Sequence, residues 1–145
     1  MPSPLDLTLV WQRHVALLFS FTSFAGRRMK IGLAEVAALE QLQVAGELSP
    51  GALGVMLSMP SASVTALLDR LEGKKMIARR PNPRDRRSQL VSLTPVAMQK
   101  AALDLLPVSE AMTSASAAMT EEERAVVTRY LEAVNNCMAR QQASA

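Results

Sequence analysis

Several residue types and segments are scarce in this sequence, and each scarcity narrows what the chain can be. The single cysteine, Cys137, excludes an intrachain disulfide and any multi-cysteine metal site. Aromatic residues make up only 3% of the chain. No apolar run approaches the ~20 residues of a membrane span, so we expect no membrane partner. The N-terminus lacks a basic start followed by a long apolar run, which predicts a cytoplasmic protein without a signal peptide.

The residues that enzymes need are also missing. The chain has one histidine, His14, no glycine-rich phosphate loop and no carboxylate cluster with a plausible partner. The acidic run Glu121–Glu123 follows Thr120 and is explained as a helix start. We therefore predict a protein that is not an enzyme and that holds no metal or cofactor.

What the sequence does contain predicts one mainly helical domain over residues 1–145. A hydrophobic content of 49% is enough for a core. Helices are expected from Leu5 to about Phe24, from Leu33 to Val44, and over two long segments after Thr94-Pro95 and Thr120, the first of them interrupted or bent near Pro107. The first helix is apolar on more than one side, so we expect a second subunit to cover it.

The central stretch, residues 48–94, predicts a helix-turn-helix followed by a two-stranded hairpin. Ser49-Pro50 and Ser61 each resemble a helix start with a hydroxyl cap. The second helix, Ser61 to about Gly73, places four large apolar residues on one stripe: Val64, Leu67, Leu68 and Leu71. Its opposite side is small and sparsely charged, which is unusual for a surface helix and favours docking against a ligand. Strands are expected over Met76 to about Pro81 and Gln89 to Leu93, joined by a turn over 82–85.

The positive charge is concentrated beside this helix. Residues 74–87 contain seven basic residues and one acid, a net charge of +6, whereas the whole chain carries +3. The rest of the chain must therefore sum to −3. A compact basic patch beside a lightly decorated helix indicates a nucleic-acid-binding face, although a basic run can also be merely solvated.

These residues resemble a known family. PNPRDRRSQLVSLT, preceded by LLDRLEGKKMIARR, is similar to the recognition helix and wing of the MarR (multiple-antibiotic-resistance regulator) family of dimeric winged-helix transcription factors. The most specific element is the D-x-R of Asp85 to Arg87, followed seven residues later by Thr94. The resemblance implies a winged helix-turn-helix lobe over about 33–94 and dimerisation helices over about 5–27 and 95–141.

The resemblance implies a ligand-responsive repressor that binds double-stranded DNA as a homodimer on a pseudo-palindromic operator. The recognition helix would enter the major groove and the wing arginines the minor groove. The implied DNA-binding residues are Ser61, Ala62, Ser63, Thr65, Ala66, Arg70, Lys74, Arg84, Asp85, Arg86 and Arg87. Ser61 can equally be an ordinary cap. Asp85 is expected to hold Arg87 in an inserting pose, or else only to shape the turn.

Two positions depart from the family pattern. Many relatives carry arginine where this chain has Ala66, so we expect specificity to depend on the wing and on DNA shape. The family usually has glycine where Lys75 stands. If that position needs a left-handed backbone, lysine costs about 1 kcal/mol, unless Gly73 ends the helix instead.

The resemblance also implies a small aromatic or phenolic effector, for which the candidate residues are Trp11, His14, Phe19 and Phe21. Two alternatives remain. The chain could be a winged-helix protein that acts through protein contacts, or a redox-responsive regulator that uses Cys137. The family's hydroperoxide sensors keep their cysteine near the N-terminus, which disfavours the second.

Overall fold

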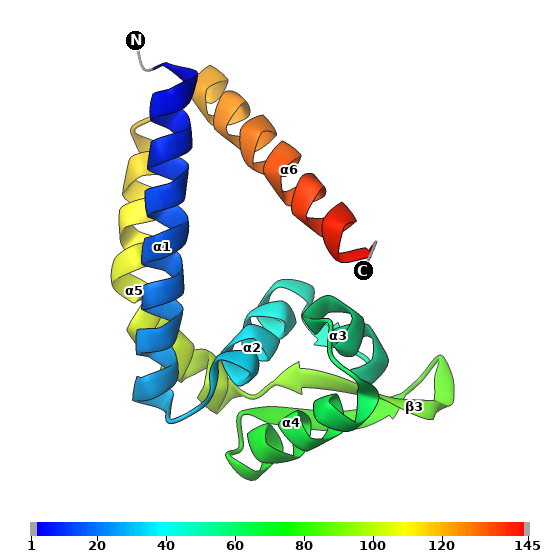
Figure 1. Ribbon diagram of the computed structural model, residues 1–145. Helices are drawn as coiled ribbons and strands as arrows, with labels where there is room; N and C mark the ends of the chain where they lie inside the picture. The colour runs from blue at the N-terminus through cyan, green and yellow to red at the C-terminus, as the bar shows by residue number, and fades with distance from the viewer. Residues whose placement is uncertain (1–2, 144–145) are drawn as a thin grey trace. The chain divides into compact units, whose positions relative to one another are not determined.

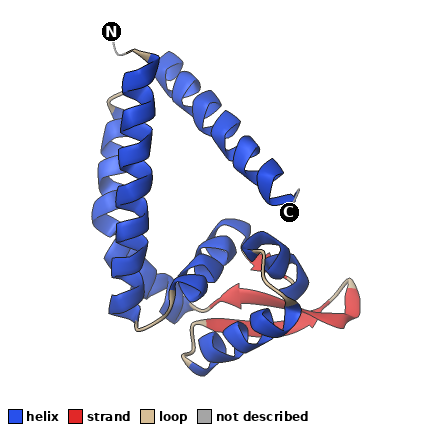
Figure 2. Cartoon of the chain, in the orientation of Figure 1, coloured by secondary structure: helices blue, strands red, loops and turns tan. Residues whose placement is uncertain are grey.

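The computed structural model describes the backbone of residues 3–143, and the side chains of these except 4, 5, 86, 104, 105 and 143. Six helices and a three-stranded sheet follow one another along the chain (Figures 1 and 2). They are α1 (Pro4–Met29), α2 (Leu33–Ala45), β1 (Glu47–Leu48), α3 (Pro50–Leu57), α4 (Ser61–Gly73), β2 (Ile77–Asn82), β3 (Asp85–Leu93), α5 (Pro95–Ala117) and α6 (Glu121–Ala143).

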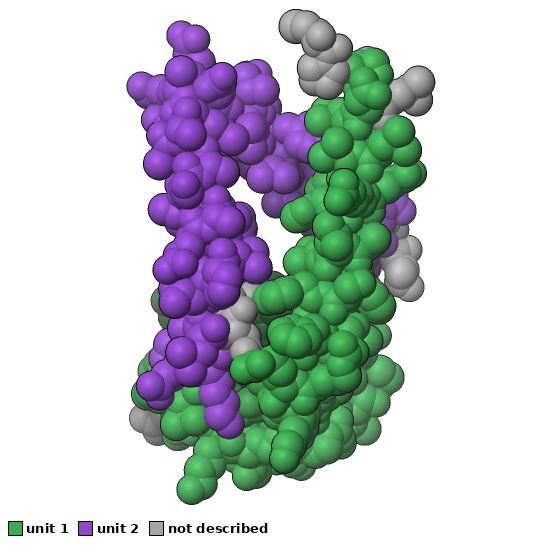
Figure 3. Space-filling view, turned by 90° about the vertical axis from the view of Figure 1, so that its left-hand side faces the viewer, with its two compact units in different colours: residues 1–97 green, residues 98–145 purple. Residues whose placement is uncertain are grey.

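The chain divides into two compact units, Met1–Ala97 and Met98–Ala145, which Figure 3 draws in green and purple. The first unit holds α1 to β3 and the first residues of α5. The second holds the rest of α5 and α6. The candidate interface lies wholly in the first unit.

The core of the first unit is aliphatic, as the scarcity of aromatic residues requires. Helices α2, α3 and α4 and strands β2 and β3 all contribute to it, together with Ile31 and Ala97. The predicted stripe of α4 is buried: Val64, Leu67, Leu68 and Leu71 are each 0–1% exposed. Burying a leucine side chain of this kind contributes about 2 kcal/mol, so this stripe fixes which face of α4 is left outside.

The sheet is antiparallel with strand order β1-β3-β2. Both wing strands lie where they were predicted, and β3 ends at Leu93 as predicted, but the predicted start of β3 was wrong. Strand β3 begins at Asp85 rather than Gln89, and Asn82 pairs with Asp85, so only two residues connect the strands. Side-chain hydrogen bonds to the turn backbone hold Asn82 and Asp85 paired within the stretch that was expected to be the turn.

Helix ends follow the cap chemistry at most of the predicted places. Ser49 Oγ accepts from Ala52 N–H at 3.2 Å, and Thr94 Oγ1 accepts from Ala97 N–H at 3.2 Å. Thr120 and Glu123 form the predicted capping box. The prediction for Ser61 was wrong: the N-cap of α4 is Pro60, and no side chain caps this helix start. Helix α5 is not interrupted at Pro107.

Helix α1 also runs further than its sequence predicted, to Met29 rather than Phe24. Gly26 lets the following turn and α2 come close to this end of α1, because a Cβ there would lie 3.0 Å from the Ile31 carbonyl oxygen and 3.2 Å from Val36 Cγ2. The close approach packs the end of α1 on α2. Arg27 and Arg28 lie in the last turn of α1, where positive charge is favourable.

Among the described residues, no single helix has the length and apolar character needed to cross a membrane. The pair α3 and α4, bent by 109° between them, meets the length and composition criteria together, which buried core helices also do.

Candidate nucleic-acid interface

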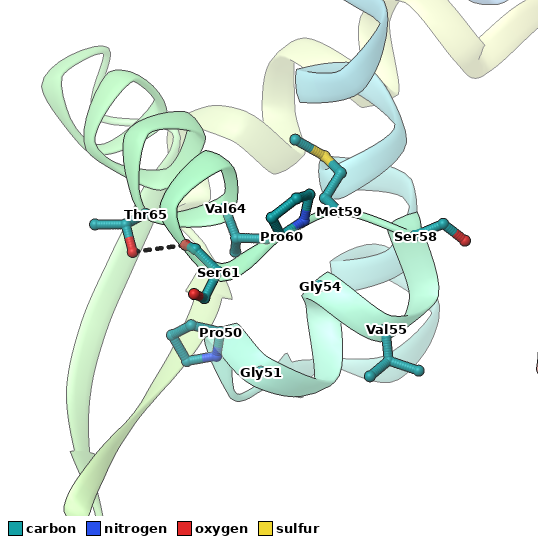
Figure 4. Close-up of a pocket in the computed structure, with 10 residues that line it drawn as sticks. All are labelled: Pro50, Gly51, Gly54, Val55, Ser58, Met59, Pro60, Ser61, Val64 and Thr65. Carbon is teal, nitrogen blue, oxygen red and sulfur yellow. Dashed lines mark hydrogen bonds between the residues drawn. The ribbon is translucent and has the colours of Figure 1, made fainter. Parts of the chain in front are cut away.

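The outward face of α4 is open and lightly decorated, as its sequence predicts. Ser61, Ala62, Ser63, Thr65 and Ala66 are all exposed. The Thr65 hydroxyl donates to the Ser61 carbonyl oxygen at 3.0 Å, as Figure 4 shows, which holds this side chain along the helix. The Ala62 and Ala66 methyl groups and the Ser63 hydroxyl are left for contact with a partner.

Helix α3 braces this face from the side. Gly54 of α3 approaches α4 so closely that an added Cβ would lie 3.2 Å from both Met59 O and Val64 Cγ2. Between the two helices lies a hollow of about 400 Å³, whose lining residues include Pro50, Ser58 and Thr65 (Figure 4). Helix α4 is thus held at its N-terminal half by packing rather than by a cap.

The wing tip, which we define as residues 82–88, is shaped by a register shift in the hairpin. Pro81 pairs with Gln89 but Asn82 pairs with Asp85, so residues 86–88 of β3 lie opposite no β2 residue in the backbone register. Proline cannot donate to the ladder and suits such a bulge. The extra residues are the ones that carry Arg86 and Arg87, so the bulge sets two arginine positions apart from the regular ladder.

Four side-chain hydrogen bonds fix the backbone of the wing tip. Asn82 Oδ1 accepts from Arg84 N–H and Asp85 Oδ1 accepts from Arg87 N–H, each at 3.0 Å. Asn82 Nδ2 donates to Ser88 Oγ at 2.9 Å, and Ser88 Oγ donates to the Asp85 carbonyl oxygen at 3.1 Å. These are the Asx-type contacts by which short polar residues stabilise turns. The conformation of the wing tip is therefore held by the side chains of its own residues.

Asp85 acts on the backbone of Arg87 in this structure. Its carboxylate accepts the Arg87 amide, and the described ion pairs include none between the Asp85 carboxylate and the Arg87 guanidinium. Of the two roles that the sequence left open, the observed contact corresponds to shaping the turn. The side chain of Arg86 lies outside the described part of the chain.

The basic patch divides into paired and unpaired residues. Arg79 contacts Asp69 at 2.5 Å and Glu72 at 3.3 Å, both on α4, and Arg80 makes two hydrogen bonds to Glu47 of β1 at 2.7 and 2.5 Å. Within the described contacts, Arg84, Arg87 and Lys75 have no acidic partner. The net charge of +6 read from residues 74–87 alone therefore overstates the field at this face. Acidic residues of α4 and β1 offset the charges of Arg79 and Arg80 at the base of the wing. The excess positive charge remains at the wing tip.

These pairs also shift pKa values. Hydrogen bonding to Arg80 lowers the pKa of Glu47, and the same hydrogen bonding raises the pKa of Arg80. Both groups are thus charged at neutral pH, and they join β1 to β2 across the central strand β3.

Arg70 and Lys74, two of the implied DNA-binding residues, each make a described hydrogen bond within the chain. Arg70 Nε donates to Glu35 Oε1 at 2.8 Å, and Lys74 Nζ donates to the Lys30 carbonyl oxygen at 2.6 Å. The roles of Glu35 and Glu47 were not predicted, because single acids on distant elements carry no local signal that they face an arginine.

Lys75 adopts the left-handed conformation that its position in the family suggested, with φ of +57°. Its N–H donates to Glu72 O at 2.8 Å, and Met76 N–H donates to Leu71 O at 3.0 Å. This is a Schellman ending, in which the left-handed residue is most often glycine. Gly73 does not replace Lys75 in this role, because the helix continues through it to the cap residue Lys74.

The four candidate effector residues lie on α1 but do not share one side of it. Trp11 and His14 stack with ring centroids 5.9 Å apart. Phe19 and Phe21 are two residues apart and therefore about 200° apart around the helix, so they face nearly opposite ways. Phe21 instead approaches Phe24, at 6.3 Å between centroids. Cys137 is exposed on α6, and the described residues contain no cluster of metal-binding side chains.

Comparison with known proteins agrees with this geometry. The sequence profile of the MarR family matches residues 30–88, which cover α2 to the wing tip. The HTH-type transcriptional regulator YcgE of Bacillus subtilis is 31% identical over 112 residues, spanning 77% of this chain and 72% of that protein. The chain belongs to the MarR family. It therefore has the mainly helical winged helix-turn-helix fold of a family of transcriptional regulators.

Solved structures of this family share the fold. A mutant MarR from E. coli superposes with a TM-score of 0.57 at 26% identity, covering 92% of this chain and 96% of that one. NadR in complex with 4-hydroxyphenylacetate gives a TM-score of 0.64 at 19% identity, covering 92% and 97%. At that identity the NadR match supports the fold only. Both family membership and fold class are as the sequence predicted.

Proposed function

We propose that this MarR-family chain is a sequence-specific DNA-binding repressor that works as a homodimer and responds to a small ligand. The observation that carries the proposal is the placement, in one compact unit, of an open α4 face beside a rigid wing tip whose Arg84 and Arg87 have no acidic partner among the described contacts. Unpaired guanidinium groups on a fixed loop suit a polyanion.

In this proposal α4 and the wing read different parts of the duplex. The exposed Ser63, Thr65 and alanine methyl groups of α4 contact base edges in the major groove. The wing arginines enter the adjacent minor groove, where A·T-rich sequence concentrates negative potential. Because α4 presents no arginine in its N-terminal half, indirect readout contributes much of the specificity.

Homodimer formation is supported by the apolar surface that one chain leaves exposed. Leu9, Val10 and Phe19 of α1 are each 64% exposed, and Leu103 and Met112 of α5 are 70% and 69% exposed. Patches of this kind mark interfaces. A two-fold axis would place two α4 helices about one turn of DNA apart. Sedimentation equilibrium at micromolar concentration should show a dimer, and a stable monomer would contradict this part of the proposal.

The DNA-binding claim is tested by selection and by salt. The wild-type protein should enrich pseudo-palindromic duplexes from a random-sequence pool. The affinity for the enriched duplex, measured by fluorescence anisotropy, should fall steeply and linearly as log Kd against log salt concentration. A winged-helix protein acting through protein contacts would enrich no sequence and would show no such slope.

The ligand response is tested on the same duplex. The related fold of NadR was solved in complex with 4-hydroxyphenylacetate, which makes phenolic acids the first probes. A phenolic acid that favours one dimer arrangement should weaken DNA binding in proportion to its differential affinity for the two arrangements. If a panel of phenolic acids at millimolar concentration leaves Kd unchanged, the phenolic class is wrong. Peroxide should leave Kd unchanged unless Cys137 is a sensor.

A further inference from the structure

Two polar links join the turn after α1 to the second half of α4. The backbone of Lys30 is left-handed, with φ of +57°, and its carbonyl oxygen accepts from Lys74 Nζ at 2.6 Å. Two residues later, Gly32 N–H donates to Glu35 Oε2 at 2.6 Å. The other oxygen of the same carboxylate, Oε1, accepts from Arg70 Nε at 2.8 Å.

Glu35 is buried, with 6% of its surface exposed, and no other charged residue is buried among the described side chains of this unit. Burying a carboxylate is costly unless it is paired and hydrogen-bonded. Capping α2 does not require the charge, because a glutamine at the same position of a capping box accepts the Gly32 N–H as well. The contact that does use the charge is the one with Arg70.

The charge is retained in the folded protein. Burial raises the pKa of Glu35, but the Gly32 hydrogen bond, the Arg70 hydrogen bond and the nearby Lys74 charge together outweigh burial, and the pKa is lowered. The carboxylate is therefore ionised at neutral pH.

Arg70 is held at one end only. Its side chain is 57% exposed, and the described contacts occupy Nε and leave the two terminal nitrogens without a partner. It lies one turn beyond Ala66 on the exposed side of α4. A guanidinium fixed through Nε has already lost much of its rotamer freedom, so less entropy is lost when its terminal nitrogens bind an anion.

We propose that Glu35 is a positioning residue, which holds Arg70 so that its terminal nitrogens face a DNA phosphate beside the recognition helix. The inference rests on the proposed function, since it assigns a role within DNA binding. The Glu35 carboxylate also connects the end of α1 and the start of α2 to α4, because it bonds both to the turn at Gly32 and to Arg70 of the recognition helix α4.

The expected change in Kd on removing the Glu35 charge is opposite to the change that electrostatics alone predicts, and this difference can be tested. Removing a negative charge near a DNA-binding face should, by electrostatics alone, strengthen binding. Loss of the Arg70 pose should weaken it. Glu35→Gln keeps the acceptor for the Gly32 N–H but removes the charge, so the two explanations predict opposite changes in Kd.

The experiment uses the full-length protein and a duplex enriched by the wild type from a random-sequence pool. Glu35→Gln should raise Kd about 10-fold and should reduce the slope of log Kd against log salt by about 2, which is one phosphate contact in each half of a dimer. Arg70→Gln should do the same, and the double variant should be no worse than Arg70→Gln. Glu40→Gln is the matched control: it removes one charge from the same helix, at an exposed residue for which no hydrogen bond or ion pair is described.

A Glu35→Gln variant that binds DNA as tightly as Glu40→Gln, with an unchanged slope, overturns the proposal even if its melting temperature falls. If Glu35→Gln does not fold, Arg70→Lys decides: it keeps the exposed charge but lacks the fork that can serve carboxylate and phosphate together. Near-wild-type affinity of Arg70→Lys would overturn the proposal, and a loss close to that of Arg70→Gln would support it. Failure of the wild type to enrich any duplex would instead refute the proposed function.

Discussion

The base and the tip of the wing carry the same residue type in two different states. At the base, Arg79 and Arg80 are neutralised by Asp69, Glu72 and Glu47, which come from α4 and β1. At the tip, the acid Asp85 bonds to a backbone amide, and the described side chains of Arg84 and Arg87 meet no acid. Arginines on one hairpin thus serve two purposes. The base attaches the sheet to α4 and β1, whereas the tip retains a charge that, in the proposed function, binds DNA.

The largest expected effect comes from the tip. Changing Arg84 and Arg87 together to alanine should weaken binding of the enriched duplex at least about 100-fold, because each arginine contact typically contributes about 1–3 kcal/mol. The melting temperature should stay within about 2 °C of the wild type, since neither side chain has an acidic partner in the described fold. Anisotropy and thermal melts measure the two effects separately. If the variant and the wild type bound the duplex with equal affinity, the arginines of the wing tip would not contribute to DNA binding, and the proposed difference between tip and base would be wrong.

The base should show the reverse pattern. Arg79→Ala removes two ion pairs and a largely buried stem that joins β2 to α4, so we expect a loss of about 1–2 kcal/mol in the free energy of unfolding. Urea denaturation measures this. Any loss of DNA affinity should be smaller than that of the tip variant. A variant as stable as the wild type, with strongly reduced DNA binding, would move Arg79 to the binding face.

The link between α4 and the wing offers a stabilising change. Lys75 holds a left-handed backbone, with φ of +57°, so Lys75→Gly should raise the free energy of unfolding by about 1 kcal/mol. Lys75→Ala is the control, because alanine also removes the lysine side chain but keeps a Cβ and so relieves no strain at this backbone conformation. Destabilisation by Lys75→Gly would show that the lysine side chain makes a contact that outweighs the strain.

The smallest effect concerns pH. Because pairing with Arg80 lowers the pKa of Glu47, the stability that this group contributes is present above its ordinary unfolded pKa and is lost as pH falls through the lower folded value. Glu47→Gln should therefore be slightly less stable than the wild type at pH 7, and the difference should be smaller at pH 3. Urea melts at both pH values, in low salt, test this. A constant difference across that range would mean that the pair contributes through packing and not through charge.

Much of this molecule follows from local sequence patterns. The apolar stripe of α4, the caps at Ser49, Thr94 and Thr120, and the existence of a basic hairpin were all predictable, because helix periodicity, capping and turn chemistry act within a few residues. Family membership followed from the D-x-R and the flanking residues. Even the strained Lys75 could be anticipated, from the glycine that the family usually has at this position.

Only the tertiary structure decided which charges are available. No local rule shows that Glu47 lies across the sheet from Arg80, or that Glu35, 35 positions from Arg70, bonds to it. The bulge that sets residues 86–88 apart also depends on strand register, which the turn fixes through side-chain hydrogen bonds. The net charge of a segment is a sum over its sequence, but its arginines are neutralised by acids that are distant in sequence and close in space. Composition therefore gives the number of arginines, and the fold determines which of them have no acidic partner.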